Sequence, residues 1–174
     1  GIPVDERTTL IKRCQATPGD RLTIVNGQVF INGKVAQNAV KQQTSYLETT
    51  NGTGINPQLL EDFNIEVRQQ LAPNIYDMVI PQEHLAEIKS YSNIKSVEPY
   101  IQKPGEADPQ VFPRSNKFKW NEDNFGPLVI PKRGYTIPLN DSTFTLYRRA
   151  IEIYENNKVD VKGNDIYVNG KKAA

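Results

Sequence analysis

The sequence is poor in cysteine, in histidine and in charge of one sign. Cys14 is its only cysteine, so the 174 residues cannot form a disulfide within the chain. The 21 basic and 20 acidic residues leave a net charge of +1, which gives no indication of a nucleic-acid partner. His84 is the only histidine, which offers little support for a histidine-rich metal site or a Ser-His-Asp triad. We therefore expect neither a metal nor a cofactor.

Long hydrophobic runs are also lacking. The longest, such as Met78-Val79-Ile80 and Leu128-Val129-Ile130, fall far short of the roughly 18 residues that predict a membrane span. The start of the chain has neither the basic residues nor the apolar core of a secretory signal. If the parent protein is anchored in a membrane, we expect the anchor to lie outside this sequence. The hydrophobic share of 37% with 24% charged residues is typical of a globular protein.

A strand predicted over residues 8–14 carries the most informative side chain. Alternation along that strand places Leu10, Lys12 and Cys14 on one face. A lysine between two apolar neighbours loses hydration, which lowers its pKa from about 10.4 and makes it a usable base near neutral pH. The alternative is an ordinary surface lysine, whose methylenes cover apolar surface while the ammonium stays in water. Periodicity alone favours this alternative, because lysine is rarely buried completely.

Turn signals follow the lysine. Thr17-Pro18-Gly19-Asp20 predicts a type II turn, in which glycine takes a positive φ. Strands are predicted over residues 21–25 and 28–31, joined by the hairpin pair Asn26-Gly27. The spacing of this hairpin recurs over residues 159–171. Since hairpins with asparagine-glycine turns are common, coincidence is the simpler interpretation of the repeat.

Between the two hairpins the sequence predicts a mixture of helices and strands. The predicted helices start at residue 56 and cover residues 81–91, and the predicted strands cover 65–69, 74–80 and 94–101. Residues 102–124 predict a surface loop, and the proline-rich stretch after it cannot be a central strand. A helix is expected over residues 140–156, with an aromatic stripe that we interpret as core packing: Phe144, Tyr147, Ile151 and Tyr154. The predicted fold class is α+β and rich in β-structure.

Two groups of segments resemble a known family. The first group is Ile2-Pro3-Val4-Asp5-Glu6-Arg7, Ile11-Lys12-Arg13-Cys14 and Pro18-Gly19-Asp20. It closely resembles the lysine motif of type I signal peptidases, the membrane-anchored serine endopeptidases that remove signal peptides from exported proteins. The second group includes Val111-Phe112-Pro113, Trp120, Asp123-Asn124-Phe125-Gly126-Pro127, Ile130-Pro131-Lys132 and Ile166-Tyr167-Val168-Asn169-Gly170. It resembles the large insertion in signal peptidases of the Bacteroidetes type.

The resemblance implies roles for five residues. Lys12 would be the general base that accepts the proton of a serine hydroxyl and later helps to activate water for deacylation. Arg13 would contact an acidic residue of the family's C-terminal box, and Pro18, Gly19 and Asp20 would support the site as a turn. The implied substrates are signal peptides of exported preproteins. The implied location is the periplasmic side of the bacterial inner membrane.

The resemblance also implies a domain plan. Residues 1–34 would be part of a signal-peptidase-type antiparallel β body that contains the lysine strand and a hairpin. Residues 35–158 would form an inserted α+β lobe, and residues 159–174 a closing hairpin that returns to the β body.

Two motifs of the family are missing from the sequence. The nucleophile belongs to a Ser-Met-x-Pro motif, but the only methionine is Met78, and none of the serines has the required neighbours. The Gly-Asp-Asn box is also absent. We therefore expect an interior piece of a signal peptidase that is inactive alone and whose free strand edges favour self-association. The alternative is a noncatalytic extracytoplasmic module. In it the insertion binds a partner protein, an envelope component or the mature part of an exported chain, and the lysine strand is scaffold.

Overall fold

The computed structural model describes residues 12–37 and 42–173, and these divide into two units. The first unit contains residues 12–23, 30–34 and 126–173. The second contains residues 24–29, 35–37 and 42–125. The three sheets of the described chain confirm the predicted β-rich α+β class.

The strands β1 (Arg21–Val25), β2 (Gln28–Ile31) and β3 (Lys34–Val35) follow one another as a meander. With β8 (Phe125–Val129) they form a four-stranded sheet in the order β3-β2-β1-β8. Asn26 and Gly27 have φ angles of 48° and 77°, which suits the tight hairpin predicted between β1 and β2. As predicted for its prolines, β8 lies at the edge of the sheet, where Pro127 need not donate a ladder hydrogen bond.

A second antiparallel meander closes the first unit. Its strands are β9 (Val159–Lys162), β10 (Asp165–Val168) and β11 (Lys171–Lys172), in the order β11-β10-β9. The helix α3 (Asp141–Arg149) precedes it and begins at Asn140, whose side chain accepts hydrogen bonds from the backbone N–H groups of Ser142 and Thr143. The structure confirms the predicted helix and its start.

The predicted aromatic stripe of α3 is only partly correct. Phe144 is buried, and the Tyr147 hydroxyl donates a hydrogen bond of 2.9 Å to the carbonyl of Val129. Tyr154, however, is 76% exposed. The helix continues after α3 as a π-helical segment, η3 (Ala150–Tyr154), whose wider turn moves the last aromatic residue out of the stripe.

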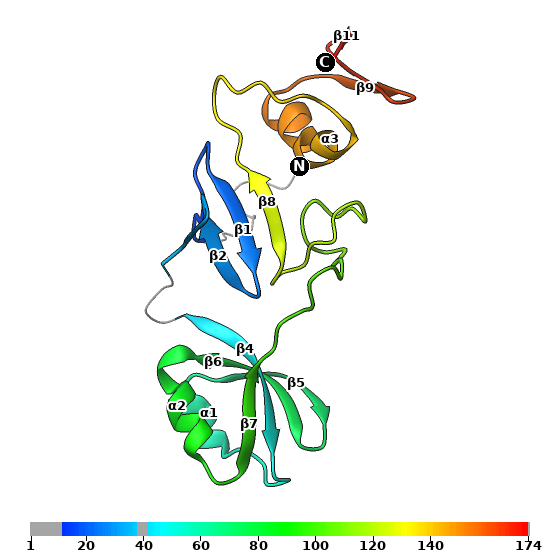
Figure 1. The fold of residues 1–174 in the computed structure, drawn as a ribbon. Helices are drawn as coiled ribbons and strands as arrows, with labels where there is room; N and C mark the ends of the chain where they lie inside the picture. The colour runs from blue at the N-terminus through cyan, green and yellow to red at the C-terminus, as the bar shows by residue number, and fades with distance from the viewer. Residues whose placement is uncertain (1–11, 38–41, 174) are drawn as a thin grey trace, which may run out of the picture. The chain divides into compact units, whose positions relative to one another are not determined.

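The second unit holds a compact lobe. Its elements are β4 (Gln43–Thr50), α1 (Pro57–Asp62), β5 (Glu66–Ala72), β6 (Ile75–Pro81), η2 (Gln82–His84), α2 (Leu85–Ser90) and β7 (Ile94–Pro99). The strands lie in the order β5-β6-β4-β7 and every neighbouring pair is antiparallel, which is the split βαβ arrangement of ferredoxin-like folds. Figure 1 shows both helices on the same side of this sheet. The predicted α+β character of this region is confirmed, although β4 was not predicted.

The core of the lobe lies between the sheet and the two helices. Its buried apolar side chains come from four of these elements and the α1–β5 connection: Tyr46, Ile65, Met78, Ile80, Ile88 and Val97. Leu59 and Leu60 of α1 pack against this cluster. The alternate residues of β4 that are buried, Tyr46 and Glu48 among them, therefore face the helices.

The predicted loop over residues 102–124 is confirmed and is organised by one buried side chain. Asn121 is fully buried, and its Nδ2 donates to the carbonyls of Lys103 and Glu106 at 2.9 Å and 2.8 Å. Its Oδ1 accepts from the backbone N–H groups of Asp123 and Asn124 at 3.1 Å and 2.8 Å. The side-chain amide of Asn121 thus supplies hydrogen-bond partners to backbone groups that lie outside any helix or sheet.

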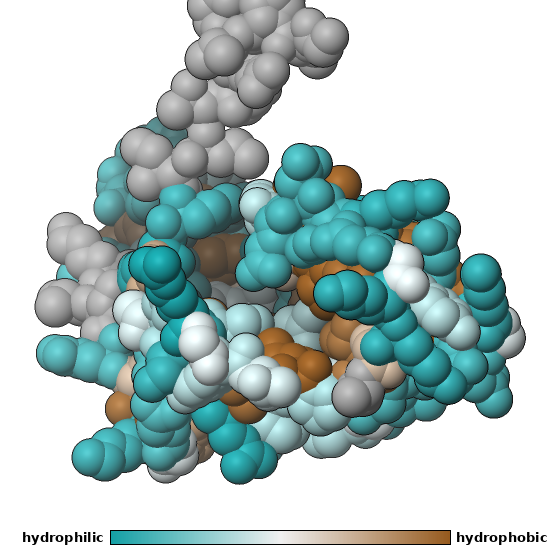
Figure 2. Space-filling view, turned by 90° about the horizontal axis from the view of Figure 1, so that it is seen from above, coloured by the Kyte–Doolittle hydropathy of each residue, from teal (hydrophilic) through white to brown (hydrophobic). Residues whose placement is uncertain are grey.

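Most of the face drawn in Figure 2 is hydrophilic, with smaller apolar patches between the polar residues. The most exposed of the large apolar side chains are Val35, Ile153 and Tyr154. Within the described stretches, every helix is too short or too polar to cross a lipid bilayer.

Candidate functional site

Lys12 and Arg13 lie at the start of the described chain and are exposed. Of the strand predicted over residues 8–14, residues 8–11 lie outside the described residues, and residues 12–14 are not in a strand. A strand requires a partner, and none of the described strands pairs with this segment. Leu10, one of the predicted apolar neighbours of Lys12, also lies outside the described residues. The exposed side chain of Lys12 agrees with the alternative interpretation of an ordinary surface lysine.

The predicted turn follows directly. Asp20 N–H donates to the carbonyl of Thr17 at 3.0 Å, and Gly19 has a φ of 98°, as a type II turn requires. The Asp20 side chain closes the same turn, because its Oδ2 accepts from both the N–H and the hydroxyl of Thr17 at 2.8 Å. These hydrogen bonds, together with one from Asn32, hold the pKa of Asp20 below its usual range.

The turn is tied to the end of β2 through Asn32. The Nδ2 of Asn32 donates to Oδ1 of Asp20 at 2.8 Å. The Oδ1 of Asn32 accepts from the N–H of Arg21 at 2.9 Å, and the N–H of Asn32 donates to the carbonyl of Arg21, also at 2.9 Å. The sequence did not indicate this bridge from Asn32 to Asp20.

The turn is also joined to the segment after β8. Gly19 N–H donates to the carbonyl of Ile130, and Ile130 N–H donates to the carbonyl of Asp20, both at 2.8 Å. A Cβ atom on Gly19 would lie 3.2 Å from Cδ of Lys132. The structure therefore joins the turn of Pro18, Gly19 and Asp20 to Asn32 and Ile130 in one hydrogen-bond network. Lys12 and Arg13 precede this network along the chain.

The serines are distributed unevenly between the two units. Ser142, in the first turn of α3, belongs to the first unit. The other five belong to the second unit: Ser45, Ser90, Ser92, Ser96 and Ser115. Among the described residues, no three or more histidine, cysteine, aspartate or glutamate side chains gather to hold a metal ion.

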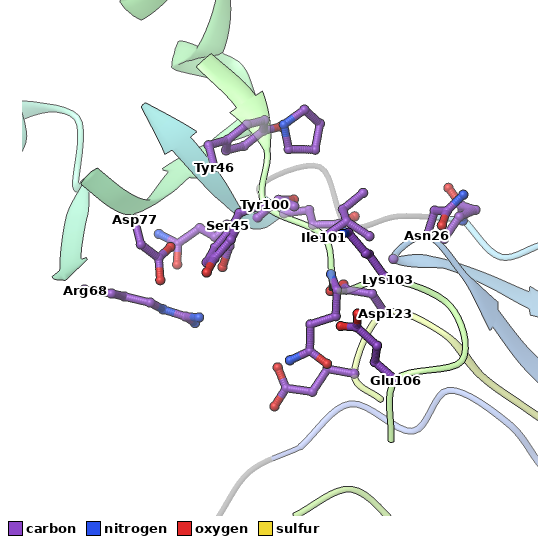
Figure 3. Close-up of a pocket in the computed structure, with 18 residues that line it drawn as sticks. Asn26, Ser45, Tyr46, Arg68, Asp77, Tyr100, Ile101, Lys103, Glu106 and Asp123 are labelled. Carbon is purple, nitrogen blue, oxygen red and sulfur yellow. Dashed lines mark hydrogen bonds between the residues drawn. The ribbon is translucent and has the colours of Figure 1, made fainter. Parts of the chain in front are cut away.

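One pocket of the second unit has a volume of about 780 Å³. Figure 3 shows Arg68 and Asp77 on one side of it and Lys103, Glu106 and Asp123 on the other. Both signs of charge line it, and Oδ1 of Asp77 is buried without a hydrogen-bond partner in the described part of the chain. Such a lining suits a polar ligand or a peptide.

Glu48 is a further buried acidic residue that the sequence did not indicate. It lies on the central strand β4 and is 1% exposed. Burial among apolar side chains raises its pKa to about 7. Because the strand over residues 43–50 was not predicted, the position of Glu48 in the core was not predicted either.

Comparison with known protein families gives a match for the first half of the chain. A family model described as signal peptidase, peptidase S26, matches residues 2–96. The matched region contains Lys12, the turn of Pro18, Gly19 and Asp20, and the lobe as far as Ser96 in β7. No curated protein and no solved structure gives a significant match.

Proposed function

We propose that Lys12 is the general base of a serine peptidase that acts on signal peptides, since this chain belongs to the signal peptidase family, peptidase S26. The observation that carries the proposal is the position of Lys12 inside the matched region, shortly before a turn with a dense hydrogen-bond network. The hydrogen bonds among Thr17, Asp20 and Asn32 fix the turn, and this turn connects the segment that carries Lys12 to β1.

The proposed reaction is acyl transfer through a serine. Neutral Lys12 takes the proton of the serine hydroxyl while the serine oxygen attacks the scissile carbonyl carbon. The peptide C–N bond then breaks as the Lys12 ammonium gives its proton to the leaving amine, and an acyl-enzyme remains. Neutral Lys12 next removes a proton from water, whose oxygen attacks the ester carbon. The ester C–O bond breaks, the serine oxygen takes the proton back from Lys12, and the signal peptide leaves with a new carboxyl group.

The exposure of Lys12 sets a condition on this mechanism. A lysine acts as a base near neutral pH only when its ammonium form is destabilised by loss of water. We propose that the bound substrate and chain segments beyond the described residues cover Lys12 in the working enzyme. Arg13 is proposed to pair with an acidic group of such a segment, and Pro18, Gly19 and Asp20 to hold the base in position.

The nucleophile is proposed to be a serine other than the six in this sequence. None of these six has the neighbours of the family's Ser-Met-x-Pro motif. The substrates are proposed to be signal peptides of exported preproteins, cleaved on the periplasmic side of the bacterial inner membrane.

The first test measures signal-peptide cleavage by the full-length protein that contains this chain, in detergent. Lys12→Ala and Lys12→Arg should each reduce turnover by about 100-fold or more, as expected for loss of a general base. Lys34→Ala is the matched control, because Lys34 is an exposed lysine of the same unit. Circular dichroism establishes that all variants are folded. Full activity in Lys12→Ala would disprove the role of Lys12.

The second test concerns the nucleophile. The isolated 174-residue chain should not cleave a signal peptide, because it lacks the proposed serine. Cleavage by this chain that disappears in Lys12→Ala would show that one of its own serines is the nucleophile.

A noncatalytic binding module remains the second candidate, and the pocket of about 780 Å³ is the observation that favours it. If the full-length protein has no peptidase activity, a preprotein peptide should still bind to the second unit. Reversing the charge of Arg68 with Arg68→Glu should then weaken that binding, as measured by fluorescence anisotropy of a labelled peptide.

A further inference from the structure

A separate cavity of about 270 Å³ lies in the lobe, between its sheet and its two helices. Most of its wall is apolar: Ile55, Leu59, Leu60, Ile65, Met78, Ile88 and Ile94. Gly54 and Asn56 also line it and are exposed, so the cavity reaches the surface beside the loop that precedes α1. A small molecule therefore has a route into it.

Glu48 is the charged residue of this wall. Its side chain is 1% exposed, and its Oε1 has no hydrogen-bond partner in the region that the structure describes. Burying a carboxyl oxygen without a partner opposes folding. An unpaired group at the wall of a cavity is well placed to bind a ligand that brings the missing donor.

The other polar side chains of the cavity are already engaged. Asn56 Oδ1 accepts from the N–H of Gln58 at 3.0 Å, and Asn93 Nδ2 donates to the carbonyl of Gly54 at 3.2 Å. The hydroxyl of Tyr91 donates to Oε1 of Glu87 at 3.1 Å. The lining contains no lysine, arginine or histidine. A positively charged partner for Glu48 must therefore come from outside the cavity wall.

We propose that this cavity binds a small primary amine with a compact apolar group, whose ammonium donates a hydrogen bond to Oε1 of Glu48. The ammonium supplies a donor and a charge opposite to that of the carboxylate, which makes a strong hydrogen bond. The apolar group is enclosed by leucine, isoleucine and methionine side chains. A cavity of roughly 150 Å³ holds a benzene ring, so this larger one accommodates a phenyl ring with a short chain.

The cavity is distinct from the Lys12 segment, which belongs to the first unit. The inference thus goes beyond the proposed peptidase function and does not depend on it. It concerns the lobe alone, and its test needs no catalytic activity.

The probe for the test is 2-phenylethylamine, added to the full 174-residue chain at neutral pH. Met78 is the only methionine, is fully buried and lines the cavity, so its labelled methyl group gives one assigned NMR signal. We expect that signal to shift and saturate with increasing amine. Glu48→Gln should weaken the binding by about tenfold or more, because a neutral amide replaces the carboxylate.

Two comparisons make the result decisive. Glu98→Gln is the matched control, since Glu98 is an exposed glutamate of β7 in the same sheet, and it should bind the amine like the wild type. The neutral alcohol 2-phenylethanol should bind the wild-type chain more weakly than the amine does. The proposal is overturned by the absence of a saturable shift at Met78, by equal binding to Glu48→Gln, or by equal binding of the alcohol.

Discussion

Asn32 and Asn169 make equivalent hydrogen bonds in the two meanders. The Nδ2 of Asn32 donates to Oδ1 of Asp20, and the Nδ2 of Asn169 donates to Oδ1 of Asn157, each at 2.8 Å. Each asparagine also accepts, at 2.9 Å, the N–H of the residue that precedes or begins the first strand of its meander, Arg21 or Lys158. The sequence repeat that we interpreted as coincidence therefore extends to the hydrogen bonds that close each meander.

Removing either asparagine should destabilise its meander to a similar degree. Asn32→Ala and Asn169→Ala each lose a side chain that bridges two segments, and we expect the free energy of unfolding to fall by about 1 kcal/mol in each case. Urea denaturation followed by circular dichroism measures the change. A loss confined to one of the two variants would contradict the equivalence of the networks.

The two networks should respond differently to acid, because only the first contains a carboxylate. Hydrogen bonds from Thr17 and Asn32 hold the pKa of Asp20 below its usual range. Their stabilising effect is present above the ordinary aspartate pKa of about 4 and is lost as the pH falls through the lowered value. Asp20→Asn should remove this part of the acid sensitivity, because an amide does not titrate in this range. Urea denaturation at pH values from neutral to about 2 tests this expectation.

Gly126 should tolerate no side chain. A Cβ atom there would lie 2.6 Å from the carbonyl oxygen of Leu22, and its φ is 91°. Gly126→Ala forces this part of the sheet apart, so we expect a loss of about 3 kcal/mol or more in the free energy of unfolding. Gly134→Ala is the control, because Gly134 has a φ of 86° with open space around its Cβ position. Its loss should be about 1 kcal/mol, from backbone strain alone. Equal losses would show that the close contact has no effect.

The two ends of the aromatic stripe should differ in their effect on stability. Phe144→Ala removes a ring that is 9% exposed and should lower the free energy of unfolding by about 3 kcal/mol. Tyr154→Ala changes a side chain that is 76% exposed and should have an effect within about 0.5 kcal/mol. Thermal and urea denaturation give both values. A large loss of stability in Tyr154→Ala would contradict the exposure of Tyr154 and support the continuous buried stripe that the sequence predicted.

The features that the sequence predicted correctly depend on local interactions. The turn at Pro18-Gly19-Asp20 and the hairpin at Asn26-Gly27 have backbone angles that few other residues adopt, so their sequences alone indicate them. The helices of the lobe follow from the spacing of their apolar residues. The edge position of β8 follows from its proline.

The features that were missed depend on contacts between distant residues. The strand β4 is rich in polar residues, and its place at the centre of the sheet is set by its pairing with β6 and β7. The position of Glu48 in the core follows from that pairing. The side-chain bridge from Asn32 to Asp20 likewise needs the folded meander.

Glu48 should make the lobe less stable as the pH rises. Its pKa is about 7 in the folded lobe, against about 4.3 in an unfolded chain, so the folded state holds more protons between these values. Stability is therefore highest below about pH 4.3 as far as this residue is concerned, and it falls as the pH rises to about 7. The difference between the two limits corresponds to about 4 kcal/mol.

Glu48→Gln should remove this pH dependence, because an amide does not titrate in this range. Between pH 5 and pH 8 the stability of the variant relative to the wild type should rise by about 3 kcal/mol. Glu98→Gln, an exposed neighbour in the sheet, should keep the wild-type slope. Urea denaturation between about pH 5 and pH 8, followed at the Met78 methyl signal, measures the lobe directly. If the free energy of unfolding of Glu48→Gln varied with pH as it does in the wild type, the pH dependence would not come from Glu48. Glu48 would then be ionised in the folded lobe throughout this range.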